Sequence, residues 1–125
     1  MKIKHLFFDL DHTLWDFNKN ALETLSELYL ELNLEDCFPS FSEFYNTYIK
    51  VNEHLWDLYR NKKITKDSLR TVRFVNAFQF FDVQNNDLAV RLGNEYVRRG
   101  PYKSNLFDSC HEVLTDLKSR YQLHI

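Results

Sequence analysis

The sequence contains very little glycine. Gly93 and Gly100 are the only glycines in 125 residues, whereas average usage would give roughly nine. Walker-type phosphate loops and dinucleotide-binding turns need several glycines close together, so both are excluded. Two glycines are also too few for the tight turns of an all-β fold. The scarcity of glycine therefore favours a mostly helical chain.

Strong net charge, paired cysteines and long apolar runs are also missing. The formal net charge is −2 at pH 7, so no basic surface for nucleic acid is expected. Cys37 and Cys110 fit no metal or redox spacing, and we expect two reduced thiols. The apolar run 6–8 stops at Asp9 and is too short for a signal-peptide core or a membrane span. These absences predict a cytoplasmic protein that binds neither nucleic acid nor a membrane.

The residues that are present predict strands at the two ends and helices between them. Residues 2–10 are apolar on both faces, which is typical of a buried parallel strand. Aromatic residues, 16% of the chain, recur with aliphatic ones at helical spacing behind good capping residues. The expected helices cover residues 20–33, 40–61, from 65 past 78, and 86–100, with a fifth from 108 or 109 to 119. A second strand is expected over residues 121–125.

This order of segments predicts an α/β protein in which the helices dominate. Residues 1–14 and 103–125 are expected to form an incomplete parallel βα core, and residues 15–102 an inserted antiparallel helical bundle. Two parallel strands do not make a stable sheet by themselves. We therefore expect the N-terminal part of a longer α/β protein, or strands that pair with another chain. The sheet would otherwise expose Leu6, Phe8 and Leu123, which favours self-association.

Two carboxylates follow the first strand. Asp9 and Asp11 are two residues apart, so they project to the same side of an extended chain. Open α/β sheets bind their ligands at the carboxyl ends of parallel strands. Neighbouring carboxylates repel unless a cation or a shared proton compensates, and Mg²⁺ suits oxygen ligands. One carboxylate could then attack phosphorus and form an aspartyl-phosphate, while the other serves as general acid and base.

This acidic pair has two alternative interpretations. A calcium loop that starts at Asp9 needs glycine at its sixth position and glutamate at its twelfth. Leu14 and Asn20 occupy those positions, so a calcium loop is excluded. A solvated acidic turn after a strand is the other alternative.

The run Asp9-Leu10-Asp11-His12-Thr13-Leu14 resembles the first signature motif, Asp-x-Asp-x-Thr, of the haloacid dehalogenase-like (HAD) hydrolase superfamily. The wider run 7–17 is similar to the 5′-nucleotidase-like phosphatases of that superfamily. The helical insert resembles their α-helical cap domain, and residues 69–74 are similar to a cap segment. This resemblance implies a Rossmann-like core, a Mg²⁺ cofactor, and hydrolysis of small phosphate monoesters such as nucleoside monophosphates.

The resemblance also implies roles for the motif residues. Asp9 would be the nucleophile and a Mg²⁺ ligand. Asp11 would be the general acid and base, with its backbone carbonyl on the metal. Backbone amides near Leu10 and Asp11 would hold the phosphoryl oxygens, and Thr13 would brace the loop. His12, which is Gly or Asp in many relatives, would have no role in proton transfer.

Two further side chains, Trp15 and Arg73, are candidates for contact with the substrate, and Asn20 is expected to have a structural role. Trp15 is expected to line a pocket for a base or another flat leaving group, or else to pack between core and cap. Arg73 suits bidentate contact with phosphate or carboxylate, and a solvated helix face is the alternative. Asn20 is expected to order the loop or cap a helix rather than touch substrate. A Phe-rich stretch is expected in the helical core: Phe74, Phe78, Phe80 and Phe81.

The superfamily's later motifs cannot be matched in this sequence. They are a Ser/Thr after the second strand, a Lys, and a late acidic pair. We therefore expect the 125-residue chain to be inactive by itself. A non-catalytic helical interaction module with a relic motif is the alternative function, and dehalogenation and phosphotransfer share the same scaffold.

Overall fold

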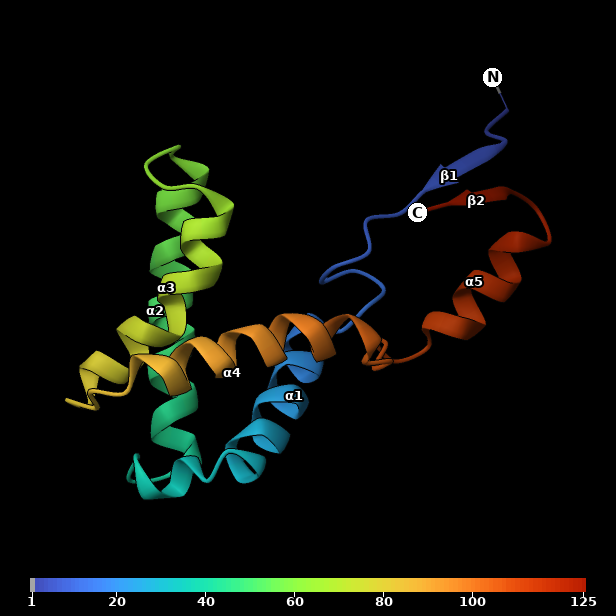
Figure 1. Ribbon diagram of the computed structural model, residues 1–125. Coiled ribbons are helices and arrows are strands. Elements are labelled where there is room, and N and C mark those ends of the chain that lie inside the picture. Colours follow the sequence, from blue (N-terminus) through green and yellow to red (C-terminus); the bar gives the residue numbers. More distant parts are fainter. Residues whose placement is uncertain (1) are drawn as a thin grey trace. The chain divides into compact units, whose positions relative to one another are not determined.

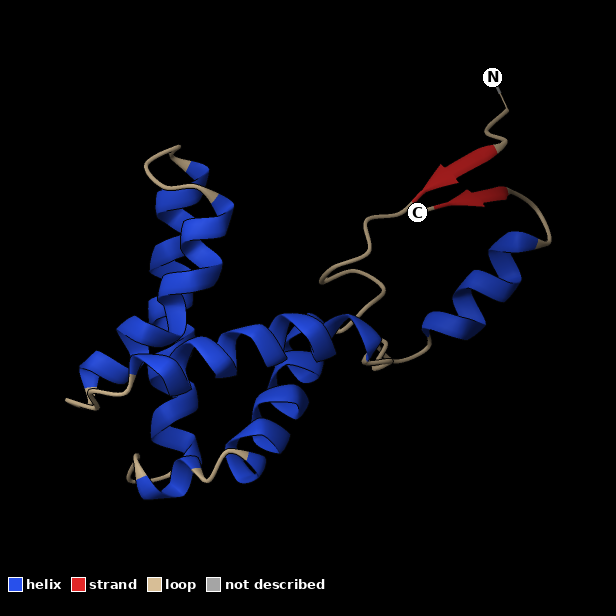
Figure 2. Ribbon diagram, in the orientation of Figure 1, coloured by secondary structure: helices blue, strands red, loops and turns tan. Residues whose placement is uncertain are grey.

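The computed structural model describes residues 2–125 and shows helices joined to a short parallel strand pair (Figures 1 and 2). The elements in chain order are β1 (His5–Phe7), α1 (Phe17–Glu31), η1 (Leu34–Asp36), α2 (Phe41–Arg60), α3 (Lys66–Phe80), α4 (Asn86–Arg99), η2 (Gly100–Tyr102), α5 (Cys110–Lys118) and β2 (Gln122–His124). The predicted class, a mostly helical partial α/β fold, is confirmed. Both cysteines are free, as expected. Within residues 2–125, no helix is long and apolar enough to cross a membrane.

Capping side chains explain where α2 and α3 begin. The Ser40 hydroxyl accepts a hydrogen bond from the Glu43 backbone N–H (3.2 Å) and donates one to the Glu43 carboxylate (3.1 Å). This reciprocal pair is a capping box. Thr65 accepts a bond from the Ser68 N–H in the same way (3.1 Å). Both helices therefore start where the sequence predicts.

One helix start is corrected by the structure. α1 begins three residues earlier than expected, because the Asp16 carboxylate accepts a bond from the Lys19 N–H (3.0 Å) and caps the helix. α4 begins at Asn86, as expected, and is capped by Asn85, whose side chain accepts from the Leu88 N–H (3.1 Å). Adjacent polar residues of similar capping strength leave the start of a helix uncertain by one position.

The strands β1 and β2 pair in parallel, as predicted, with Leu6 opposite Leu123. The expectation that the first strand is buried is wrong, since Phe7 is 79% exposed. The expectation that Leu6, Phe8 and Leu123 face water is also wrong, because all three are half-buried. Alternate residues of a strand point to opposite faces. One flanking helix can cover only one face of a two-stranded sheet. Here the face that carries Phe7 is exposed to solvent.

Contacts within the chain divide it into two compact units. We call Met1–Ala21 with Tyr102–Ile125 the strand unit, and Leu22–Pro101 the helical unit. The assignment of residues 1–14 and 103–125 to an enzyme core, and of 15–102 to a cap, stays a prediction.

The helical unit is built around α3, which packs against both α2 and α4. α2 and α3 form an antiparallel pair, and α4 crosses it instead of completing the simple bundle that we expected (Figure 1). The crossing is close, because a Cβ at Gly93 would lie 3.3 Å from the Phe74 ring. Phe74 and Phe78 are buried as predicted, whereas Phe80 is 71% exposed and lies outside the core.

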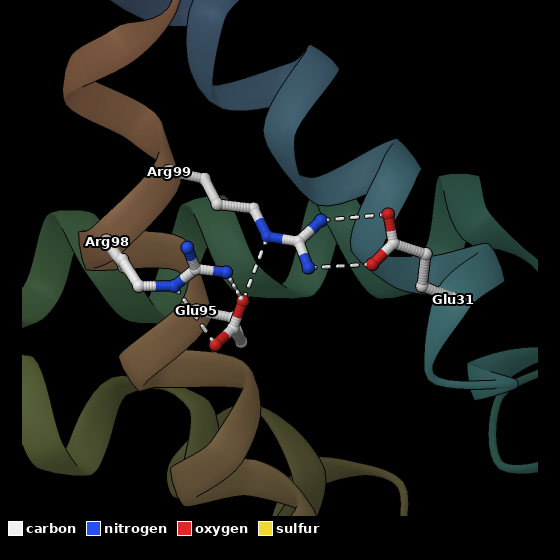
Figure 3. Close-up of polar contacts among 4 residues, drawn as sticks. All are labelled: Glu31, Glu95, Arg98 and Arg99. Carbon is white, nitrogen blue, oxygen red and sulfur yellow. Dashed lines mark hydrogen bonds and ion pairs between the residues drawn. The ribbon is translucent and has the colours of Figure 1, made fainter.

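An ion-pair network links α4 to α1 in the helical unit (Figure 3). The Arg99 guanidinium lies 2.7 Å from the Glu31 carboxylate and donates through Nε to Glu95 (2.9 Å). Arg98 donates twice to Glu95, at 3.2 and 2.5 Å. Hydrogen bonds from Arg98 and Arg99 lower the pKa of Glu95 to about 2. The bond from Arg99 also lowers the pKa of Glu31.

We predict that Arg99→Met reduces the acid sensitivity of folding. A carboxyl group whose pKa is lowered by folding stabilises the folded state above its ordinary pKa, and this contribution disappears as the pH falls through the folded value. For Glu95 the window runs from its ordinary value of 4.5 down to about 2. Urea unfolding across this window should show a shallower loss of stability in Arg99→Met than in the wild type. Arg91→Met, an exposed site on the same helix, is the control and should keep the wild-type slope.

Candidate functional site

The loop after β1 closes on a single carbonyl group. We call residues 8–16 the motif loop. The Leu10 carbonyl accepts hydrogen bonds from the backbone N–H groups of Thr13 (3.3 Å), Leu14 (3.0 Å) and Trp15 (2.9 Å). The chain therefore folds back over Leu10 directly behind the strand. Thr13 lies in this turn, which is the position expected for a residue that braces the loop.

His12 makes the reversal possible through its backbone. Its φ of 61° is in the left-handed region, which Gly, Asn, Asp and His tolerate better than other residues. Its N–H donates to the Trp15 carbonyl (3.1 Å), and its ring lies 5.0 Å from that of Phe17. The resemblance places Gly or Asp at this position in many relatives, and both suit the same conformation. Position 12 therefore has a conformational role in the loop.

The carboxylates of Asp9 and Asp11 are exposed and make no hydrogen bond or ion pair within residues 2–125. The backbone N–H groups of Asp9, Leu10 and Asp11 are also without a partner in that part of the chain. The same holds for the Asp11 carbonyl. Successive free N–H groups form a concavity that suits an anion. The motif loop thus offers oxygen ligands and amide donors within three residues.

Trp15 connects the motif loop to residues 103–106, which precede α5 (Cys110–Lys118). Its indole Nε1 donates to the Lys103 carbonyl (2.8 Å), and its backbone bridges to Leu106. Its half-buried ring lies edge-on to Phe17, with ring centres 5.8 Å apart. The indole N–H is therefore hydrogen-bonded within the strand unit. Only the aromatic ring is available for contact with a ligand. The predicted contact between Trp15 and a base stays a prediction.

Asn20 and Asn105 join the start of α1 to the same segment. Asn20 is fully buried, and its amide donates to the Asn105 carbonyl (2.9 Å). The Asn20 carbonyl oxygen accepts from the Asn105 backbone N–H (3.0 Å) and side-chain amide (2.8 Å). The Asn105 carbonyl also accepts from the Asp16 N–H (3.0 Å). The expectation that Asn20 orders the loop is confirmed. Its partner was missed, because 85 residues separate the two and no local pattern connects them.

Arg73, the remaining predicted site residue, belongs to the helical unit. It is buried, whereas Lys66 and Arg70 on the same helix are exposed. The alternative that Arg73 lies on a solvated helix face is therefore wrong.

We predict that Asn20→Ala destabilises the strand unit. The substitution removes the acceptor of the Asn105 backbone N–H and one of the two donors to the Asn105 carbonyl. Loss of a hydrogen bond to a buried polar group costs about 1–3 kcal/mol. Chemical unfolding should show this loss. Asn18→Ala removes an exposed amide from the same helix and serves as the control. Equal stability of the two variants would contradict a structural role for the asparagine pair.

A second prediction concerns His12. His12→Gly should leave stability close to that of the wild type, because glycine adopts a positive φ without cost. His12→Val should destabilise the loop by about 1–2 kcal/mol, since a β-branched residue is strained in the left-handed region. Thermal unfolding of the two variants checks the ordering. A valine variant as stable as the glycine variant would show that the backbone conformation does not govern this position.

Comparison with known proteins shows which proteins this chain is similar to. No protein-family model matches it. Pyrimidine 5′-nucleotidase PynA of Streptococcus pneumoniae is 32% identical over 127 aligned positions, covering 99% of this chain and 50% of that protein. YfnB of Bacillus subtilis, named as a HAD-hydrolase, is 23% identical over 124 positions, covering 99% and 50%. The solved structure of YfnB, bound to magnesium, matches 98% of this chain and 51% of its own with a TM-score of 0.85 and 22% identity.

The chain thus spans about half the length of the curated relatives that it matches. Sequence similarity over nearly all of its residues and a shared fold agree with the motif at residues 9–14. Over nearly all of its residues, the chain is similar in sequence and in fold to hydrolases of the HAD superfamily.

Proposed function

We propose that the chain carries the nucleophile and the helical cap of a Mg²⁺-dependent phosphomonoester hydrolase that acts on nucleoside monophosphates. The observation that carries this proposal is the motif loop, where the unpaired carboxylates of Asp9 and Asp11 stand beside free backbone N–H groups. The similarity to a protein named as a pyrimidine 5′-nucleotidase supports this class of substrate.

In the proposed reaction, the Asp9 carboxylate attacks the phosphorus atom and the bond to the leaving oxygen breaks. Asp11 donates a proton to that oxygen, so the nucleoside departs as an alcohol. The resulting aspartyl-phosphate is then attacked by water, whose proton returns to Asp11. Phosphate leaves, and the Asp9 carboxylate is regenerated.

The backbone of the motif loop would stabilise the charge that develops on the phosphoryl oxygens. Free N–H groups at Leu10 and Asp11 point to this role, since preorganised backbone donors need no rearrangement during the reaction. Thr13, in the turn closed by the Leu10 carbonyl, would keep these donors in place. Trp15 would offer its ring to a flat leaving group.

The oxygen atoms of the motif loop suit Mg²⁺. Within residues 2–125 no group of three or more His, Cys, Asp or Glu side chains could hold a metal ion. Mg²⁺ commonly uses only one or two carboxylates and keeps several waters, so the Asp9 carboxylate and the free Asp11 carbonyl are a fitting ligand pair. A bound Mg²⁺ supplies positive charge beside the phosphoryl oxygens.

The test uses the full-length product of the gene with uridine monophosphate and Mg²⁺. Asp9→Asn should abolish phosphate release, because the amide is not a nucleophile. Asp11→Asn should lower kcat by about 10²–10⁴-fold, the usual contribution of general acid–base catalysis. Asp108→Asn, an exposed site outside the motif loop, is the control and should turn over normally. Undiminished hydrolysis by Asp9→Asn would contradict the proposal.

We also expect residues 1–125 alone to release no phosphate from uridine monophosphate. They span half the length of the related hydrolases, and the superfamily's later motifs have no match among them. An assay of the purified 125-residue chain with Mg²⁺ checks this. Turnover that disappears in Asp9→Asn would show that residues 1–125 are sufficient for hydrolysis.

A further inference from the structure

Two histidines from opposite ends of the chain meet across the strand pair. His5 lies on β1 and His124 on β2, 119 residues apart in the sequence, and the two strands run side by side (Figure 1). The Nδ1 atom of His5 lies 3.1 Å from the Nε2 atom of His124. Only one proton can lie between two ring nitrogens, so one of them donates and the other accepts. The pair therefore brings two potential metal ligands together at one place on the sheet.

The strand backbone and an aromatic stack position the two imidazole rings. The register of the strands places His124 opposite Phe7, and the two rings stack with their centres 4.5 Å apart and an angle of 15° between their planes. His5 precedes Phe7 by two residues, so both lie on the same face of β1. His5 is exposed on this face and His124 is half-buried. Within residues 2–125 neither side chain makes another hydrogen bond or an ion pair. Both rings are thus held in place while their nitrogens remain accessible.

Two neutral imidazoles at this spacing suit a divalent transition-metal ion. Imidazole nitrogens bind Zn²⁺ at about 2.0–2.1 Å, so two of them on one ion lie about 3 Å apart. Mg²⁺ prefers oxygen ligands and is disfavoured at such a pair. Within residues 2–125 no third His, Cys, Asp or Glu side chain joins the pair as a ligand. Water would complete the coordination shell, which the exposed position of His5 allows.

We propose that His5 and His124 bind one Zn²⁺ ion and that this ion links β1 to β2. The site is separate from the oxygen ligands of the motif loop and does not depend on the proposed hydrolase function. Zn²⁺ takes the place of the proton between the two nitrogens, and that proton is released to solvent. A metal bridge stabilises most when it closes a long stretch of chain, and this one encloses residues 5–124. Two parallel strands are not stable by themselves, so the ion would fix the strand that leads into Asp9.

Calorimetric titration of the untagged full-length protein with Zn²⁺ tests the binding. An excess of Mg²⁺ is present to compete for carboxylate ligands. His5→Gln and His124→Gln should each weaken Zn²⁺ binding by at least about 10-fold, since even the loss of an outer-shell partner of a metal has an effect of that size. His111→Gln removes an exposed imidazole from α5 in the same unit and is the control, which should bind normally. Asp9→Asn should also bind Zn²⁺ as the wild type does, which places the ion outside the motif loop.

Hydrogen exchange tests the link between the strands. The Phe8 N–H donates to the His124 carbonyl and the Gln122 N–H to the Lys4 carbonyl, both at 2.9 Å. Zn²⁺ at about 100 times its Kd should slow the exchange of these two N–H groups about 10- to 100-fold in the wild type, and should not slow it in His5→Gln. The absence of Zn²⁺ binding, wild-type affinity in both histidine variants, or loss of binding in the motif-loop variant would overturn the proposal. Binding that leaves the exchange unchanged would overturn the link between the strands.

Discussion

The conformation of the motif loop depends on the hydrogen bonds that the Leu10 carbonyl accepts. By accepting three backbone N–H groups from the following turn, it reverses the chain immediately after β1. The N–H groups of residues 9–11 have no partner within residues 2–125, and two carboxylates are held beside them on an exposed loop. The left-handed backbone of His12 permits the turn, and the bonds of Trp15 and Asn20 to residues 103–106 fix its far side. A short polar sequence thereby presents two exposed carboxylates beside backbone N–H groups.

A different constraint governs the helical unit. α4 crosses the α2–α3 pair where Gly93 allows close contact with Phe74. This contact brings aromatic rings from three helices together and encloses the Arg73 side chain among them. Ion pairs of Arg99 join the other end of α4 to α1. The unit is therefore held together by aromatic packing between its helices.

Local patterns predicted the helices, the parallel strands and the motif, because helical spacing, capping and short motifs depend only on residues that are close in the sequence. Features that depend on distant segments were not predictable. The exposure of Phe7 depends on what covers the sheet, and the bonds of Asn20 depend on a segment 85 residues away. A solvated helix face was the alternative for Arg73, but α4 packs against α3 and the Arg73 side chain is buried beside Tyr96.

The central claim is that Asp9 forms a covalent bond to phosphorus. The most direct measurement is to quench the full-length protein in acid during turnover of uridine monophosphate with Mg²⁺, digest it, and analyse the peptides by mass spectrometry. The account predicts that the peptide containing Asp9 gains the mass of one phosphoryl group, and that Asp9→Asn gains none. Turnover without any phosphorylated peptide, or with the group on another residue, would contradict it.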